Sequence, residues 1–133
     1  MLGHALARKT LPRFRDSMTV AWLKCVGDAW CELNNLNLSH SHFNNLEGVY
    51  IIWHGGQNPA TVYVGQGNIR DRLSEHRGNA NIQAFGSLGL FVTWAEIPVA
   101  SRGGVEKFLA ESLRPKVGTV HPLALPIPVN LPW

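Results

Sequence analysis

The chain has 133 residues, of which 45% are hydrophobic and 16% are charged. This length suits one domain with a sizeable buried core, and the composition is too apolar for a disordered chain. A net charge of +3 tolerates an anionic partner without requiring one. No apolar run approaches the roughly 18 residues of a membrane span, so we expect no membrane partner and a cytoplasmic location. Nothing in these properties indicates an oligomeric state.

Residues 1–45 are predicted to form a basic arm and a helix that pack on the rest of the same domain. Residues 1–16 are rich in Arg and Lys, which is typical of a solvated tail and also suits a phosphate-contacting arm. In residues 17–36 apolar side chains recur every three or four positions, which predicts one amphipathic helix with a buried face. Cys25 and Cys31 match no metal or redox spacing, so we expect reduced thiols.

The middle of the chain predicts a β-hairpin followed by a helix. GVYIIW (48–53) and TVYVG (61–65) are rich in β-branched and aromatic residues, and the turn formers HGGQNPA separate them. IRDRLSEHR (69–77) then has the spacing of a helix, with Asn68 as its N-cap and Gly78 as its stop. Gly48 and Gly65 occupy strand positions where glycine costs stability, which indicates a close backbone approach or a bend.

Two further elements complete the predicted core. LFVTWAEIPV (90–99) alternates apolar and polar side chains as a third strand with one buried face. GGVEKFLAESL (103–113) predicts a second helix that ends before Pro115, since proline disfavours helix in the residue before it. We therefore predict an α/β (α+β) fold. Its small, three-stranded, mainly antiparallel sheet is flanked by helices, and an extra helix lies at the N-terminal side. Residues 46–133 form the main domain and end in a Pro-rich segment.

The order of these motifs resembles the GIY-YIG nuclease superfamily. GVY and YVG correspond to its two signature strands, and Tyr63 lies thirteen residues after Tyr50. Arg72 and His76, four residues apart, match the arginine and histidine of its first helix. Glu106 lies nine residues before Pro115, as the family's glutamate does. The resemblance covers residues 46–118 and extends to 130 if an insertion is allowed.

One position departs from the family pattern. The family places an asparagine three residues after the proline, where this chain has Gly118. Asn130 is the nearby candidate for this asparagine, but it would require an insertion. By this resemblance Asn130 is a candidate substrate-binding residue, and Arg70 and Arg77, on the same helix as Arg72, are further candidates.

The resemblance implies a metal-dependent DNA endonuclease with a GIY-YIG-like fold. Tyr50 would be the general base, Tyr63 would position the water or phosphate, and Arg72 would stabilise the transition state. His76 would assist proton transfer or bind phosphate, and Glu106 would hold Mg²⁺ or Mn²⁺. RNA stays open as a substrate beside DNA.

The residue types suit this chemistry without the family name. Phosphodiester hydrolysis needs a base, a cation for the phosphate and stabilisation of the developing oxyanion. Arginine offers a permanent charge in a planar fork, and Mg²⁺ needs only one carboxylate beside substrate oxygens. Tyrosine has an ordinary pKa near 10, so nearby positive charge must favour its anion.

Each of these side chains also has a simple structural explanation, as a hairpin tyrosine, a solvated arginine or a charge that complements a helix end. Two other functions therefore stay open. One is a nucleic-acid-binding module of the same fold with little or no catalysis. The other is a protein-interaction domain that uses the Pro-rich segment LALPIPVNLPW (123–133).

Overall fold

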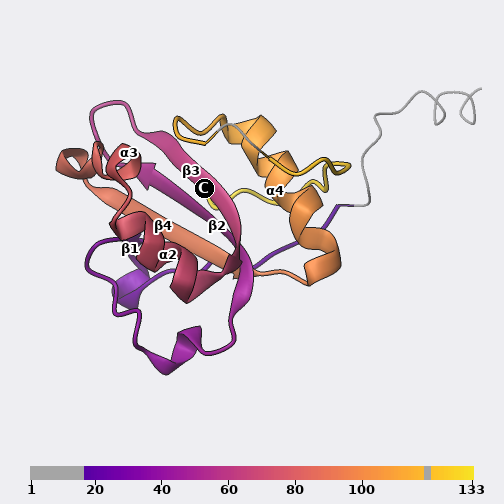
Figure 1. Ribbon diagram of the computed structural model, residues 1–133, viewed down its shortest axis with the longest axis horizontal. Coiled ribbons are helices and arrows are strands. Elements are labelled where there is room, and N and C mark those ends of the chain that lie inside the picture. The colour runs from indigo at the N-terminus through magenta and orange to yellow at the C-terminus, as the bar shows by residue number, and fades with distance from the viewer. Residues whose placement is uncertain (1–16, 119–120) are drawn as a thin grey trace, which may run out of the picture.

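A four-stranded antiparallel sheet forms the centre of an α+β fold in the computed structural model, which describes residues 17–118 and 121–133 (Figure 1). The strand order is β1-β4-β2-β3. The strands are β1 (Cys31–Glu32), β2 (Glu47–His54), β3 (Ala60–Asn68) and β4 (Leu90–Glu96). The prediction of three strands was one short, because the two-residue β1 pairs with the outer side of β4. The predicted basic arm, residues 1–16, lies outside the described residues.

The predicted hairpin is confirmed and its first strand is the centre of the sheet. β2 pairs with β3 on one side and with β4 on the other. Because side chains alternate along a strand, Val49 and Ile51 point to one face of the sheet and Tyr50 and Ile52 to the other. All four side chains are fully buried, so both faces of β2 must be covered.

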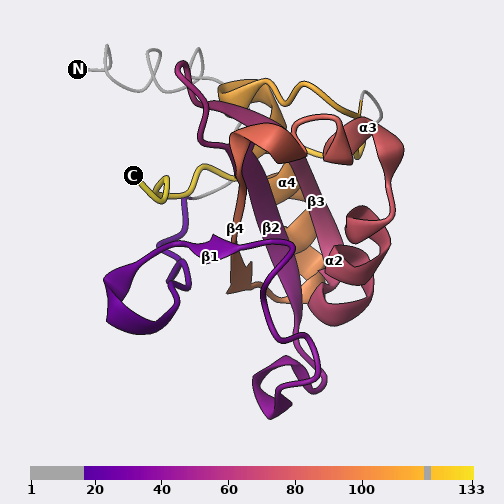
Figure 2. The same cartoon turned by 90° about the vertical axis from the view of Figure 1, so that its left-hand side faces the viewer.

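Helices cover the two faces of the sheet (Figures 1 and 2). Helices α2 (Ile69–Arg77) and α3 (Ala80–Gln83) lie on one face, and α4 (Val99–Leu113) lies on the other. Single 3-10 turns occur at Val26–Asp28, Ser41–Phe43 and Gly86–Leu88. In the part of the chain that the structure describes, no helix has the length and apolar character needed to cross a membrane.

Both ends of α2 follow the sequence signals, whereas α4 begins earlier than its sequence pattern predicts. The side chain of Asn68 accepts a hydrogen bond from the main-chain nitrogen of Asp71, so it is the predicted N-cap of α2, and Gly78 is its C-cap. Helix α4 begins at Val99, four residues earlier than predicted, and ends two residues before Pro115. Its C-cap, Arg114, adopts a left-handed conformation.

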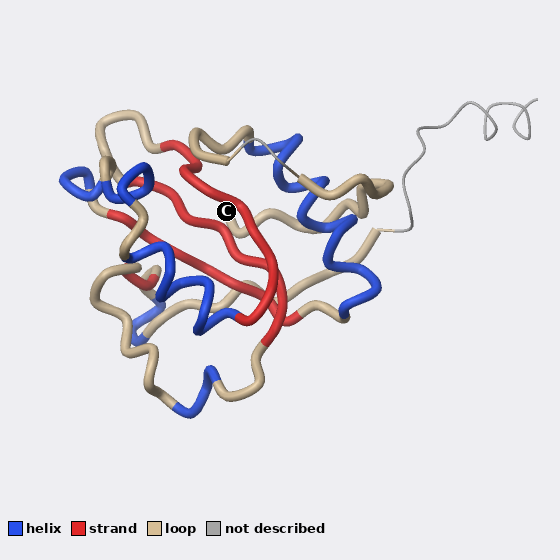
Figure 3. Tube along the Cα trace, in the orientation of Figure 1, coloured by secondary structure: helices blue, strands red, loops and turns tan. Residues whose placement is uncertain are grey.

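The predicted helix over residues 17–36 was wrong. This segment runs as an extended chain with a 3-10 turn and the short β1, and Figure 3 draws most of it as loop. Its main-chain groups bond to other segments: Met18 N donates to Pro128 O and Leu23 N to Trp94 O. Gly27 and Asp28 have positive φ values of 76° and 59°, which an α-helix does not allow. Pairing with the sheet and the C-terminal segment therefore outweighs the local helical periodicity.

The prediction of free thiols was also wrong, because Cys25 and Cys31 form a disulfide whose Cα atoms are 5.1 Å apart. The bond closes the loop that carries Gly27 and leads into β1. Structural disulfides are typical of oxidising compartments. The cytoplasmic location therefore stays a prediction without support from this feature.

We expect reduction of the Cys25–Cys31 disulfide to lower the free energy of unfolding by about 2 kcal/mol, because a short closed loop removes limited entropy from the unfolded chain. Denaturant titration with and without reductant measures this difference. A Cys25→Ala/Cys31→Ala variant should not respond to reductant. Two titratable thiols in the folded, unreduced protein would contradict the pairing.

Candidate active site

Tyr50 is the buried centre of the candidate site. It lies in β2 directly opposite Gly65 of β3, and its ring crosses the space that a side chain at position 65 would fill. The tyrosine side chain is 0% exposed. Its hydroxyl lies 2.6 Å from His76 Nε2, which comes from the last turn of α2. Position 65 therefore requires a glycine because Tyr50 packs closely on the neighbouring strand.

Three aromatic rings gather at this point. The rings of Tyr50 and Tyr63 are nearly parallel, with their centroids 6.1 Å apart. The ring centroids of Tyr63 and His76 are 4.4 Å apart. Tyr63 is partly exposed, whereas Tyr50 and His76 are buried. Tyr63 therefore forms the outer layer of the cluster. Gly118, with φ of +87°, packs against the Tyr63 ring and leaves no room there for a side chain.

Arg72 extends from α2 over Gly67 into the same cluster. Its Nη1 lies 3.5 Å from the exposed carboxylate of Glu75. Among the described residues, Arg72 Nε and His76 Nδ1 are buried side-chain nitrogens without a hydrogen-bond partner. Buried polar atoms are normally paired, so these two unpaired nitrogens are candidate contacts for a polar ligand.

The charges in the cluster act on Tyr50 in opposite directions. Burial raises the pKa of Tyr50 above its ordinary value, while the hydrogen bonding and positive charge of Arg72 lower it in part. Burial, with a smaller contribution from Arg72, lowers the pKa of His76 to about 4. At neutral pH His76 is therefore uncharged, and its Nε2 can accept the hydroxyl proton of Tyr50 in a hydrogen bond.

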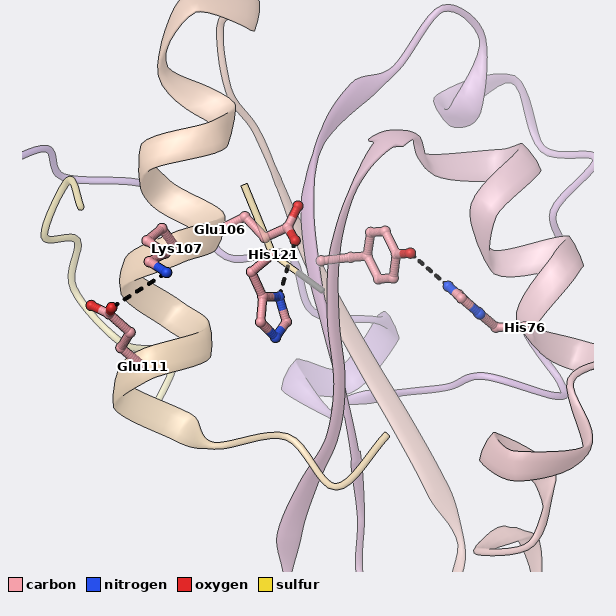
Figure 4. Close-up of polar contacts among 6 residues, drawn as sticks. His76, Glu106, Lys107, Glu111 and His121 are labelled. Atoms are coloured by element: carbon pink, nitrogen blue, oxygen red, sulfur yellow. Dashed lines mark hydrogen bonds and ion pairs between the residues drawn. The ribbon is translucent and has the colours of Figure 1, made fainter. Parts of the chain in front are cut away.

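Glu106 approaches from the opposite side, on α4. Figure 4 shows Glu106 and His121 on the α4 side and His76 on the α2 side, with the strands between them. The Glu106 carboxylate is close enough to Tyr50 for its negative charge to contribute to the raised pKa of the tyrosine. Glu106 is itself buried, and its Oε2 lies 3.3 Å from His121 Nδ1. The structure thus places all five predicted catalytic residues around one section of the β2–β3 hairpin.

A metal ion would have one protein carboxylate at this place. In the described ranges, no group of three or more His, Cys, Asp or Glu side chains has the geometry to hold a metal. A buried Glu106 with only one oxygen bonded nevertheless fits a hard cation such as Mg²⁺ or Mn²⁺ that keeps waters and binds substrate oxygens. Glu106 Oε1 would be the local donor to such an ion, since Oε2 already bonds to His121.

Arg70 and Arg77, predicted to contact substrate, are directed at the N-terminal segment. Arg70 donates to the main-chain oxygens of Leu38 and His40 and to the side chain of Asn44. Arg77 donates to the main-chain oxygens of Leu33 and Leu36. Both guanidinium groups therefore tether the segment before β2 to α2 and do not point toward Tyr50.

Asn130, the other predicted substrate contact, bonds to the N-terminal segment. Its side-chain oxygen accepts from Val20 N at 2.7 Å, and its amide nitrogen donates to Val20 O at 3.0 Å. These bonds join the C-terminal segment to residues 18–20 beside an isolated parallel bridge between Met18 and Val129. The structure thus gives Asn130 a tethering contact and does not bring it to Tyr50 or Glu106.

The predicted role of Gly48 is supported by the packing. A Cβ atom at position 48 would overlap the main-chain oxygen of Ala95 in β4, so a side chain cannot fit. Gly48 therefore allows β2 and β4 to pair closely at the end of the sheet where α2 begins.

The site contains one residue that sequence reasoning missed, His121. It follows the family pattern, which ends at position 118, and no fixed spacing links it to Glu106. Only the return of the chain toward α4 brings it there.

A separate hollow of about 470 Å³ lies near the other end of α4 and has an aromatic wall of Trp30, Trp53 and Trp133. None of the described residues that line it has a titratable side chain. We therefore assign the candidate chemistry to the Tyr50 cluster and not to this hollow.

We expect acid to destabilise the protein through His76. Its pKa is about 4 in the folded protein and about 6.5 when unfolded, so the unfolded state binds more protons between these values. The contribution of neutral His76 to the free energy of unfolding is fully present above pH 6.5. It falls by about 3 kcal/mol as the pH drops toward 4. Urea titrations at pH 7 and pH 4.5 measure the loss. His76→Gln should lack this part of the pH dependence, and an equal pH dependence in both proteins would contradict the assignment.

Comparison with known protein families, curated proteins and solved structures finds no match for this chain.

Proposed function

We propose that this protein is a metal-dependent endonuclease that hydrolyses phosphodiester bonds in DNA. The observation that carries the proposal is the convergence of Tyr50, Tyr63, Arg72 and His76 on one face of the β2–β3 hairpin, with the Glu106 carboxylate on the α4 side near enough for its charge to act on Tyr50. These residues come from four separate elements. Convergence of one aromatic base, one fixed cation and one buried carboxylate is more than ordinary packing requires.

In the proposed reaction Arg72 and Tyr63 meet the substrate first. Both are partly exposed, whereas Tyr50 behind them is not. The Arg72 guanidinium would bind a non-bridging phosphate oxygen, and its unpaired Nε supplies a free donor for this. Because Tyr50 is fully covered, the proposal requires the Tyr63 and Arg72 side chains to shift when substrate binds, so that a water can reach the Tyr50 hydroxyl.

Tyr50 and His76 would then move the proton. The attacking water gives a proton to the Tyr50 oxygen as its own oxygen bonds to phosphorus, and the Tyr50 hydroxyl passes its proton to His76 Nε2. The bond from phosphorus to the leaving oxygen breaks. In the unbound protein both pKa shifts oppose this transfer. A bound phosphate would raise the pKa of His76, and a cation at Glu106 would lower that of Tyr50.

Glu106 would hold the divalent ion, Mg²⁺ or Mn²⁺, through the carboxylate oxygen that does not bond to His121. When bound, such an ion supplies positive charge to stabilise the developing phosphate and leaving-group oxygens. The Glu106 carboxylate points toward the strands, and its burial keeps bulk water from screening its negative charge.

A nucleic-acid-binding domain without catalysis is the second candidate. The full burial of Tyr50 and its raised pKa favour this alternative, since a base must reach water and give up its proton. Arg72 and Tyr63 could still contact a phosphate in such a domain. The two functions can be told apart at Glu106: the endonuclease needs it for cleavage, whereas the binding domain has no cleavage for it to support.

Plasmid nicking with Mg²⁺ tests the choice. We expect wild-type protein to convert supercoiled DNA to the nicked form, and Glu106→Gln or added chelator to stop this, because the ion loses its one carboxylate. Glu111→Gln is the matched control, since Glu111 lies on the same helix and pairs at the surface with Lys107. A gel shift without nicking by the wild type would favour the binding domain.

Substitution of Arg72 should affect catalysis, whereas substitution of Arg70 should affect stability. Arg72→Met should lower the nicking rate about a hundredfold or more with little change in melting temperature, because it removes a donor that acts on the transition state. Arg70→Met should lower the free energy of unfolding by about 1–3 kcal/mol, because it leaves main-chain oxygens without their charged donor. Nicking kinetics and thermal melts of both variants measure this. A folded Arg70→Met protein that has lost nicking, beside a normal Arg72→Met, would reverse the assignment.

A further inference from the structure

His121 is the hydrogen-bond partner of the buried Glu106 carboxylate. Its Nδ1 lies 3.3 Å from Glu106 Oε2, and the two side chains are only 18% and 9% exposed. Figure 4 shows the imidazole beneath the carboxylate, with its second ring nitrogen on the far side from Glu106. With Nδ1 carrying the proton, the pair is an N–H donor facing one carboxylate oxygen. The other oxygen, Oε1, has no such partner among the described residues.

The chain is anchored four residues before His121 and six residues after it, which restricts where the imidazole can lie. Before it, Lys116 N and Val117 N donate to the main-chain oxygens of Thr61 and Val62, so this segment adds to the free edge of β3. After it, Ile127 N donates to Gly104 O at 2.9 Å, and the Ile127 side chain occupies the space above that glycine. His121 is thus held between the edge of the sheet and the first half of α4.

This arrangement matters because the site offers a metal only one carboxylate. A glutamate side chain has three rotatable bonds, and an unrestrained one would spend much of its time away from the productive direction. A hydrogen bond to one oxygen fixes the plane of the carboxylate and leaves the other oxygen free. Outer partners of this kind commonly change metal affinity by about ten- to a hundredfold.

We propose that His121 is a positioning residue for Glu106, holding Oε2 so that Oε1 is presented to the divalent ion bound with the phosphate. This inference rests on the proposed function and adds to it a residue outside the motif pattern. His121 acts through Glu106, so its loss should weaken metal binding and leave the chemical step intact once metal is saturating.

The test compares two metal readouts in His121→Phe and His121→Asn. Phe removes both ring nitrogens at similar size, whereas Asn restores an N–H donor near the position of Nδ1. The first readout is the Mg²⁺ concentration that gives half-maximal plasmid nicking, together with the rate at saturating Mg²⁺. The second is the affinity of the protein alone for Mn²⁺, from the electron paramagnetic resonance signal of the free ion. Lys107→Met, next to Glu106 but in a surface ion pair, is the control.

For His121→Phe we expect the half-maximal Mg²⁺ concentration to rise about tenfold or more, with Mn²⁺ affinity weakened to match and the saturated rate within a few-fold of wild type. His121→Asn should recover most of the affinity, and Lys107→Met should match wild type. Should His121→Phe fail to fold, His121→Ala carries the same comparison.

Two results would overturn the inference alone. One is an active, Glu106-dependent enzyme whose metal dependence is unchanged in His121→Phe. The other is a fall in the saturated rate with unchanged metal affinity, which would make His121 a proton-transfer residue. A wild-type protein that does not nick, or a Glu106→Gln protein that nicks normally, overturns the proposed function and this inference with it.

Discussion

The pairing of Tyr50 with Gly65 is the constraint on which the candidate site depends. Because the glycine has no side chain, the Tyr50 ring can lie across β3 and reach His76 with its hydroxyl. A shift of one residue in this register would send Tyr50 to the α4 face and Val49 and Ile51 toward α2. The same register also places Tyr63 beside Tyr50. The position of the aromatic cluster therefore follows from strand pairing.

Helix α2 serves both the fold and the site. Its buried side chains, Ile69 and Leu73, pack on the sheet, while Arg72 and His76 complete the polar cluster. Arg70 and Arg77 point instead to the loop before β2 and satisfy its main-chain oxygens. Charged donors to buried or half-buried carbonyls are among the stronger hydrogen bonds in proteins. These tethers hold α2 in place, which in turn fixes Arg72 and His76 relative to Tyr50.

The electrostatics of the unbound site favour a neutral Tyr50 and a neutral His76. Burial dominates both shifts, and the single positive charge of Arg72 does not offset it at Tyr50. A bound phosphate and a divalent ion would reverse these preferences. The negative phosphate would favour protonated His76, and the positive ion would favour ionised Tyr50. In the proposed enzyme the base would therefore form only when substrate and metal are both present. Tyr50 and His76 would both stay uncharged in the absence of substrate.

The sequence by itself determined the hairpin, the third long strand, helices α2 and α4, and the order of the candidate catalytic residues. These features depend on local signals: alternation in 48–53 and 61–65, the Asn68 cap, and the break at Pro115. The five catalytic candidates could be named because their order and spacing resemble the GIY-YIG pattern.

Only the tertiary structure decided what residues 17–36 and the C-terminal segment do. The apolar spacing of 17–36 suits a helix, yet its main-chain groups bond to Trp94 and Pro128, and Cys25 bonds to Cys31. Likewise, no local pattern could show that Arg70, Arg77 and Asn130 face neighbouring main chain, or that His121 returns to Glu106. Local periodicity reports which conformation a segment prefers alone. Contacts between residues far apart in sequence contribute energies comparable to these local preferences, and here they determine the conformation of residues 17–36.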